Sequence, residues 1–109
     1  MVVVVFITKL RADADLEEYG RLAERMFELV QQNPGFISLT SSTDPDGSEV
    51  TIARFASEEA EQAWRNHPEH RKIQELGRST FYESYQIEVC TAVRGYSFHQ
   101  EGGITHQVL

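Results

Sequence analysis

The order in which hydrophobic patterns follow one another constrains the fold of this chain more than any other feature. Val2 to Leu10 is rich in β-branched residues and apolar on both faces, which is typical of a central strand. Residues 16–30 then carry an apolar stripe of helical period. Asp15 precedes this stripe, and Glu18 follows three residues later in the reciprocal capping pattern. The sequence Asn33-Pro34-Gly35 ends this helix.

The second half predicts a hairpin, two short helices and a last strand. Strands at residues 36–42 and 49–55 flank the turn sequence Asp44-Pro45-Asp46-Gly47. Ser57 caps one short helix. Asn66 or His67 caps the next, which has Pro68 at its first position and runs towards Tyr82. From residue 85 to residue 96 the side chains alternate, so we expect a strand with one apolar face.

This β-α-β-β-α-α-β order predicts an α+β protein with a ferredoxin-like fold, in which helices cover one face of a four-stranded antiparallel sheet. The other face carries apolar side chains and no helix, so we expect a homodimer in which a second copy covers it. We expect the domain to span residues 1–96. Residues 97–109 show no clear period and form a tail, either disordered or ordered on contact, whose apolar residues would cover the partner subunit or a pocket mouth: Phe98, Ile104, Val108 and Leu109.

Composition excludes several classes of partner. The 109 residues suit a single domain, and the net charge of −7 argues against nucleic-acid and anionic-membrane partners. The longest apolar run, Met1 to Ile7, is too short to span a bilayer and is not followed by a cleavage site. Cys90 is the only cysteine, so we expect a cytoplasmic protein with a reduced, buried thiol.

Four motifs together resemble the antibiotic-biosynthesis monooxygenase (ABM) family of dimeric α+β barrels, over about residues 1–96. They are Pro34-Gly35-Phe36, Trp64, His67-Pro68-Glu69-His70 and the run from Gly77 to Tyr85. The resemblance implies two sheets packed face to face and, in each subunit, a pocket between sheet and helices. It also implies chemistry of two kinds: oxygenation of aromatic polyketides or quinols with O₂ and no flavin or metal, or haem degradation.

The sequence departs from the haem-degrading branch at two positions. That branch uses an Asn on the first strand and a His about ten residues after the Trp. Here the first strand has no Asn, and Gln74 stands ten residues after Trp64. In the quinol-type branch a His begins this helix, and His70 is the match.

Oxygenation without a cofactor requires a base, a donor for the developing negative charge and an apolar wall that holds an aromatic substrate. His70 is the best candidate base. Arg78, Tyr82 and Tyr85 are candidate donors, while Trp64, Phe81 and Phe6 are candidates for a stacking wall. We therefore predict three catalytic residues, His70, Arg78 and Tyr82, and four substrate-binding residues, Trp64, Phe6, Phe81 and Tyr85. We expect no cofactor, no metal and a small apolar or aromatic ligand.

Each candidate also has a purely structural interpretation. His70 can bond locally, Trp64 can belong to the core, and the tyrosines can pack in an interface. Arg78 can pair at the surface with Glu75 or Glu83. His67 and His70 are spaced as metal ligands can be, but a third ligand would have to come from elsewhere. For the whole protein, two alternatives remain: a non-catalytic small-molecule-binding protein, and a structural dimer whose pocket is packed shut by aromatic side chains.

Overall fold

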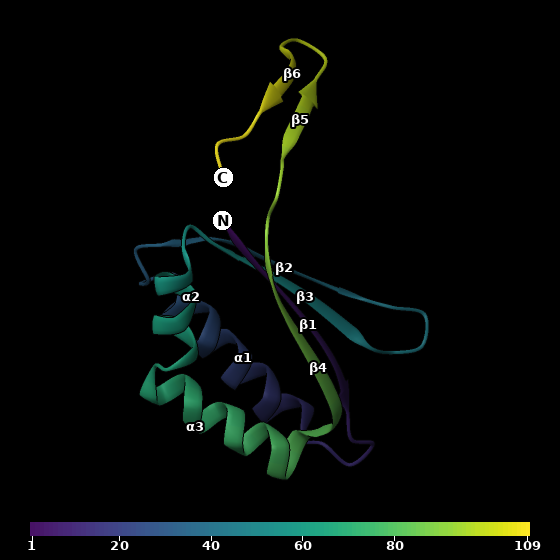
Figure 1. The fold of residues 1–109 in the computed structure, drawn as a ribbon. Coiled ribbons are helices and arrows are strands. Elements are labelled where there is room, and N and C mark those ends of the chain that lie inside the picture. Colours follow the sequence, from purple (N-terminus) through teal and green to yellow (C-terminus); the bar gives the residue numbers. More distant parts are fainter.

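A computed structural model describes all 109 residues. Its main sheet is four-stranded and antiparallel with helices on a single face, as the sequence predicts (Figure 1). The strand order is β2-β3-β1-β4, so β1 is central. A π-helical turn, Gly77–Phe81, joins the last helix to β4. The elements are β1 (Val2–Leu10), α1 (Leu16–Val30), β2 (Phe36–Thr43), β3 (Glu49–Phe55), α2 (Glu58–Arg65), α3 (Pro68–Leu76), β4 (Tyr82–Thr91), β5 (Tyr96–His99) and β6 (Gly103–His106).

The helices begin at the predicted residues. The Asp15 carboxylate accepts a hydrogen bond from the Glu18 backbone N–H (3.1 Å), and the Ser57 hydroxyl accepts one from Ala60 (3.2 Å). His67, not Asn66, caps α3: its Nδ1 accepts from the Glu69 N–H at 3.2 Å. Pro68 follows at the first helical position, where the missing N–H has no partner to lose.

The two faces of the sheet differ in what covers them. In β1, Val4 and Phe6 face the helices, and Val3, Val5 and Ile7 alternate with them on the uncovered face. Val50 and Ile52 of β3 pair with Ile7 and Val5 on that same uncovered face. We call the side formed by these five apolar residues of β1 and β3 the bare face.

The apolar residues of the last strand face the helices, so they do not contribute to the bare face. Antiparallel partners share a face, and Val89 and Ile87 pair with Val4 and Phe6 of β1. On the bare side β4 places Glu88 and other polar residues. The apolar centre of the bare face therefore comes from β1 and β3.

The predicted boundaries of the last strand are also wrong, because β4 begins at Tyr82 and ends at Thr91. The Arg11 N–H donates to the Phe81 carbonyl (2.8 Å), and a bulge at Lys9 and Leu10 lets Leu10 pair with Tyr82. Long-range pairing with β1 therefore converts residues with helical periodicity into strand.

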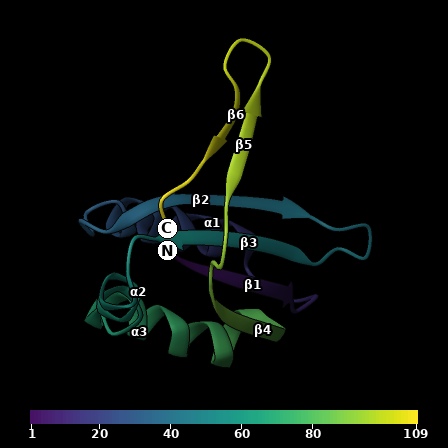
Figure 2. The same ribbon diagram turned by 45° about the horizontal axis from the view of Figure 1, so that its top comes forward.

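Residues 96–106 form a β-hairpin of β5 and β6, a feature not anticipated for the tail. In both views the hairpin stands beyond the end of the sheet, away from the helices (Figures 1 and 2). Tyr96 and Phe98 lie on one of its faces with Ile104, and each is more than 60% exposed. The hairpin thus carries an apolar face that its own chain leaves uncovered. The domain boundary at residue 96 stays a prediction.

Two further observations concern the surface. Cys90 pairs with Val3 and is exposed on the bare face, so the expected burial of its thiol is wrong. The Cys90 side chain lies on the side of the sheet that has no helices. None of the helices has both the length and the apolar character needed to cross a membrane.

Candidate active site

A cavity of about 350 Å³ lies between the sheet and the helices. Its volume is at the lower end of the range for small-molecule sites. The cavity argues against the alternative of a structural dimer whose pocket is packed shut by aromatic side chains. All seven predicted site residues line this cavity: Phe6, Trp64, His70, Arg78, Phe81, Tyr82 and Tyr85. They come from β1, the helices, the π-helical turn and β4, which only the folded chain brings together.

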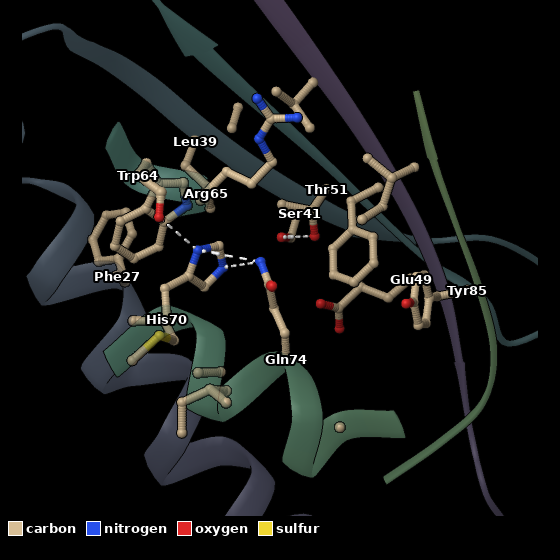
Figure 3. Close-up of a pocket in the computed structure, with 18 of the residues that line it drawn as sticks. Phe27, Leu39, Ser41, Glu49, Thr51, Trp64, Arg65, His70, Gln74 and Tyr85 are labelled. Atoms are coloured by element: carbon tan, nitrogen blue, oxygen red, sulfur yellow. Dashed lines mark hydrogen bonds between the residues drawn. The ribbon is translucent and has the colours of Figure 1, made fainter. Parts of the chain in front are cut away.

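His70 is held by contacts on two sides (Figure 3). Its ring stacks on the indole of Trp64, with centroids 4.0 Å apart and planes at 16°. Its Nδ1 lies 3.0 Å from the Trp64 carbonyl oxygen. The side-chain nitrogen of Gln74, one turn later in α3, lies 3.5 Å from Nε2. These contacts fix the imidazole against the cavity wall.

The Trp64 carbonyl determines which nitrogen of His70 carries the proton. A carbonyl oxygen can only accept, so Nδ1 is the protonated nitrogen and Nε2 keeps a lone pair. Burial lowers the pKa of His70 below its usual 6.5; the Trp64 carbonyl opposes this shift, and the charge of His67 adds to it. The imidazole is therefore neutral at pH 7, and its unprotonated Nε2, which has a long contact of 3.5 Å with the Gln74 amide nitrogen, provides the lone pair that a general base requires.

Trp64 serves the cavity and the core at once. It packs against the buried cluster of Val30, Ala53 and Phe55 and also lines the cavity beside His70. Trp64 therefore belongs to the core and also lines the cavity, and its role in binding a substrate stays a prediction.

The predicted aromatic residues other than Trp64 form one connected cluster, which we call the aromatic cluster. Phe6 makes edge contacts with Tyr82 and Tyr85, at centroid distances of 6.0 and 5.8 Å. Tyr19 of α1 joins the cluster through Phe81 and Tyr82, and its hydroxyl lies 3.5 Å from that of Tyr82. Phe81 is 2% exposed, so most of its ring belongs to the core.

Burial raises the pKa of Tyr19 and, more strongly, that of Tyr82. Both hydroxyls therefore stay protonated near neutral pH and can donate to a ligand oxygen. Tyr82 occupies this position because Gly77 has no side chain: a Cβ there would lie 2.4 Å from the Tyr82 ring. The π-helical turn thus positions the aromatic cluster.

Arg78 lies on the exposed rim of the cavity, where its Nη1 donates to the Tyr85 hydroxyl at 3.4 Å. It forms no ion pair, so the alternative pairing with Glu75 or Glu83 does not occur. His67 does not line this cavity, and its Nδ1 caps α3.

Sequence reasoning did not assign several residues with polar groups to the cavity wall, and Gln74 is one of them. Gln74 stands four residues after His70, a helical spacing that marks it as a neighbour. Others required knowledge of how the elements pack, because helical period alone assigns them to the core or to solvent: Tyr19, Glu49, Glu61 and Arg65. Glu61 is 7% exposed and pairs with Arg65 at 3.5 Å.

Comparisons with known proteins agree with this architecture. Residues 1–76 match the antibiotic biosynthesis monooxygenase (ABM) family. The uncharacterized protein YqjZ of Bacillus subtilis (strain 168) is 39% identical over 82 residues, which are 75% of this chain and 72% of that protein.

Two solved structures share the fold at low sequence identity. Rv0793 from Mycobacterium tuberculosis is 19% identical with a TM-score of 0.73, covering 84% of this chain and 94% of that one. SnoaB from Streptomyces nogalater, a cofactor-independent oxygenase, is 19% identical with a TM-score of 0.69, covering 84% and 91%. The family match over most of the chain, together with the fold and the cavity, establishes that this protein belongs to the antibiotic biosynthesis monooxygenase family.

Proposed function

We propose that this protein is a cofactor-independent monooxygenase that acts on a hydroxylated aromatic or quinol-type small molecule. The single observation that carries the proposal is the state of His70: a half-buried, neutral imidazole on the wall of an apolar cavity, whose unprotonated Nε2 has a long contact of 3.5 Å with the Gln74 amide nitrogen. Family membership and the likeness to a cofactor-independent oxygenase support it.

In this proposal His70 takes the acidic proton of the substrate. The resulting carbanion or phenolate gives an electron to O₂, and the two radicals combine to a peroxide. For an anthrone-type substrate, a ring CH₂ and one O₂ become a ring C=O and one water. The substrate supplies all four electrons, so the reaction needs no further reductant.

Other residues of the cavity wall meet the two remaining requirements, which are an apolar wall for the substrate and a donor for the developing negative charge. Phe6 and Trp64 offer ring faces to an aromatic substrate. Tyr82 and Arg78 offer donors for the negative charge that develops on oxygen as the substrate ionises.

O₂ uptake with anthrone and with quinols, without added cofactor, tests this function. His70→Gln should lower the rate at least about a hundredfold, since general bases contribute on that order. His67→Asn is the matched control, because Asn also caps helices and leaves the cavity unchanged. Uptake that is equal in wild type and His70→Gln would contradict the proposal. A ligand that co-purifies unchanged, with no uptake, would favour a non-catalytic binding protein.

We also propose a homodimer in which two bare faces pack together. The bare face carries Val3, Val5, Ile7, Val50 and Ile52 with no helix over them. Light scattering after size exclusion should give twice the chain mass at micromolar concentration. Val5→Lys, at the centre of the bare face, should give the mass of one chain, and a monomeric wild type would contradict the proposal.

A further inference from the structure

A second polar region lies in the cavity away from His70. Glu49, at the start of β3, lies beside Tyr85 on the cavity wall (Figure 3). Thr8 of β1 pairs with Glu49 on one side and Tyr85 on the other, so the three side chains form a row on the helix-facing side of the sheet. The hydroxyls of Tyr19 and Tyr82 face this row closely enough to feel the charge of Glu49.

Glu49 has no partner within the chain. It takes part in none of the ion pairs, and no side chain donates a hydrogen bond to its carboxylate. Glu61, the other acid of the cavity wall, is paired with Arg65. A carboxylate only accepts hydrogen bonds, so a half-buried one on a cavity wall suits a ligand that donates.

The charge of Glu49 also favours the protonated form of neighbouring hydroxyls. Burial is the largest cause of the raised pKa of Tyr82, and the Glu49 carboxylate raises it further. A ligand hydroxyl bound at this end experiences the same field and keeps its proton. At the other end of the cavity, the Nε2 lone pair of His70 accepts the proton from the acidic position of the ligand.

We propose that Glu49 is a specificity-determining residue that accepts a hydrogen bond from a neutral ring hydroxyl and so orients an aromatic ligand with its opposite end at His70. This inference rests on the proposed function for the identity of the cavity's ligand. The ligand class is narrowed to aromatics with a free hydroxyl remote from the acidic position. Methyl ethers of the same ring system should bind poorly.

Binding of two unreactive probes tests the inference. 2-Hydroxyanthraquinone and 2-methoxyanthraquinone differ only at the hydroxyl, and both are already oxidised at the central ring. Trp64 is the only tryptophan and lines the cavity, so quenching of its fluorescence reports occupancy. The hydroxyl probe should bind about tenfold more tightly than its ether, as expected for one charge-assisted hydrogen bond. The pKa of its hydroxyl, read from the absorption of the anion, should rise on binding.

Variants assign the effect to Glu49. Glu49→Gln should reduce both the tenfold preference and the pKa rise, since it removes the charge and leaves a neutral acceptor, while affinity for the ether stays unchanged. Glu24→Gln makes the same chemical change on the exposed side of α1, outside the cavity, and should behave as wild type. If Glu49→Gln does not fold, the comparison of the two probes on wild-type protein still decides the matter.

Equal affinities of the two probes for wild type would overturn the inference, as would an unchanged preference in Glu49→Gln. Absence of quenching by either probe would overturn it as well, because the cavity would then not take such rings. Neither probe reacts with O₂, so these results do not depend on turnover. Failure of the O₂-uptake experiment alone would reject the oxygenase and leave the role of Glu49 in binding intact.

Discussion

The imidazole of His70 lies parallel to the indole of Trp64, with 4.0 Å between centroids, and the carbonyl of the same tryptophan accepts from its Nδ1 at 3.0 Å. One residue therefore sets both the tilt and the tautomer of the candidate base. The backbone contact survives any substitution of the side chain, whereas the stacking contact does not.

Activity should depend on pH through His70. The base works only when neutral, and burial lowers its pKa below 6.5. We therefore expect kcat/KM to be constant above neutrality and to fall on acidification, with a midpoint below pH 6.5. A pH–rate profile with an anthrone-type substrate measures this midpoint; a midpoint above 6.5 would contradict the assigned state of His70.

Trp64 fluorescence should report the same ionisation without substrate. A protonated imidazole stacked on an indole accepts an electron from its excited state and quenches it. Emission should fall on acidification with a midpoint below 6.5, and His70→Gln should abolish the transition. His67, whose ring centroid is 6.2 Å from the indole, provides the control through His67→Asn, which should keep the transition.

Stability should also fall as the pH is lowered past 6.5. The folded-state pKa of His70 lies below the unfolded value, so the unfolded chain binds the proton more tightly in this window. Protonation of His70 therefore favours unfolding, and the loss of stability is complete once the pH lies below the folded-state pKa of His70. Urea denaturation between pH 7.5 and 5 should show a steeper loss for wild type than for His70→Gln; parallel curves would show that burial of His70 carries no such cost.

Gly77→Ala should disturb the aromatic cluster. The new Cβ would lie 2.4 Å from a Tyr82 ring carbon, so the ring must move. Overpacking of this kind costs about 1–3 kcal/mol, measurable by chemical denaturation. Gly20→Ala is the matched control, because nothing lies within 4 Å of the position of its Cβ and helical alanine is favoured. A stability of Gly77→Ala equal to that of wild type would show that the turn relaxes.

The hairpin should contribute to association. Tyr96, Phe98 and Ile104 are exposed together on one of its faces. Deleting residues 97–109 should weaken the proposed dimer, measured as a higher dissociation constant in sedimentation equilibrium. Ser97→Ala, on the opposite face of the hairpin, should leave it unchanged. An unaltered constant in the deletion would show that the hairpin is passive.

Local patterns predicted the order and type of the elements because each carried its own cap or period. The capping pair Asp15 and Glu18 and the turn around Gly47 are signals of this kind. The resemblance supplied the candidate residues, and the fold placed all seven on one cavity wall.

The sequence did not predict the register in which the strands pair. The start of β4 and the helix-facing side of Ile87 follow from how β4 aligns with β1, over seventy residues away in the chain. Glu49 escaped notice for the same reason: its proximity to Tyr85 exists only through Thr8 between them. The hairpin of β5 and β6 was not predicted because each strand has only four residues, which is too short for a clear alternating pattern.

The central strand β1 has one further consequence. Its side chains alternate, so Val4 and Phe6 line the cavity while Val3 and Val5 lie on the bare face. A single layer of backbone cannot absorb a displacement on one side without passing it to the other. Widening the cavity to admit a larger ring therefore shifts the bare face, and a protein surface packed on the bare face would resist this widening.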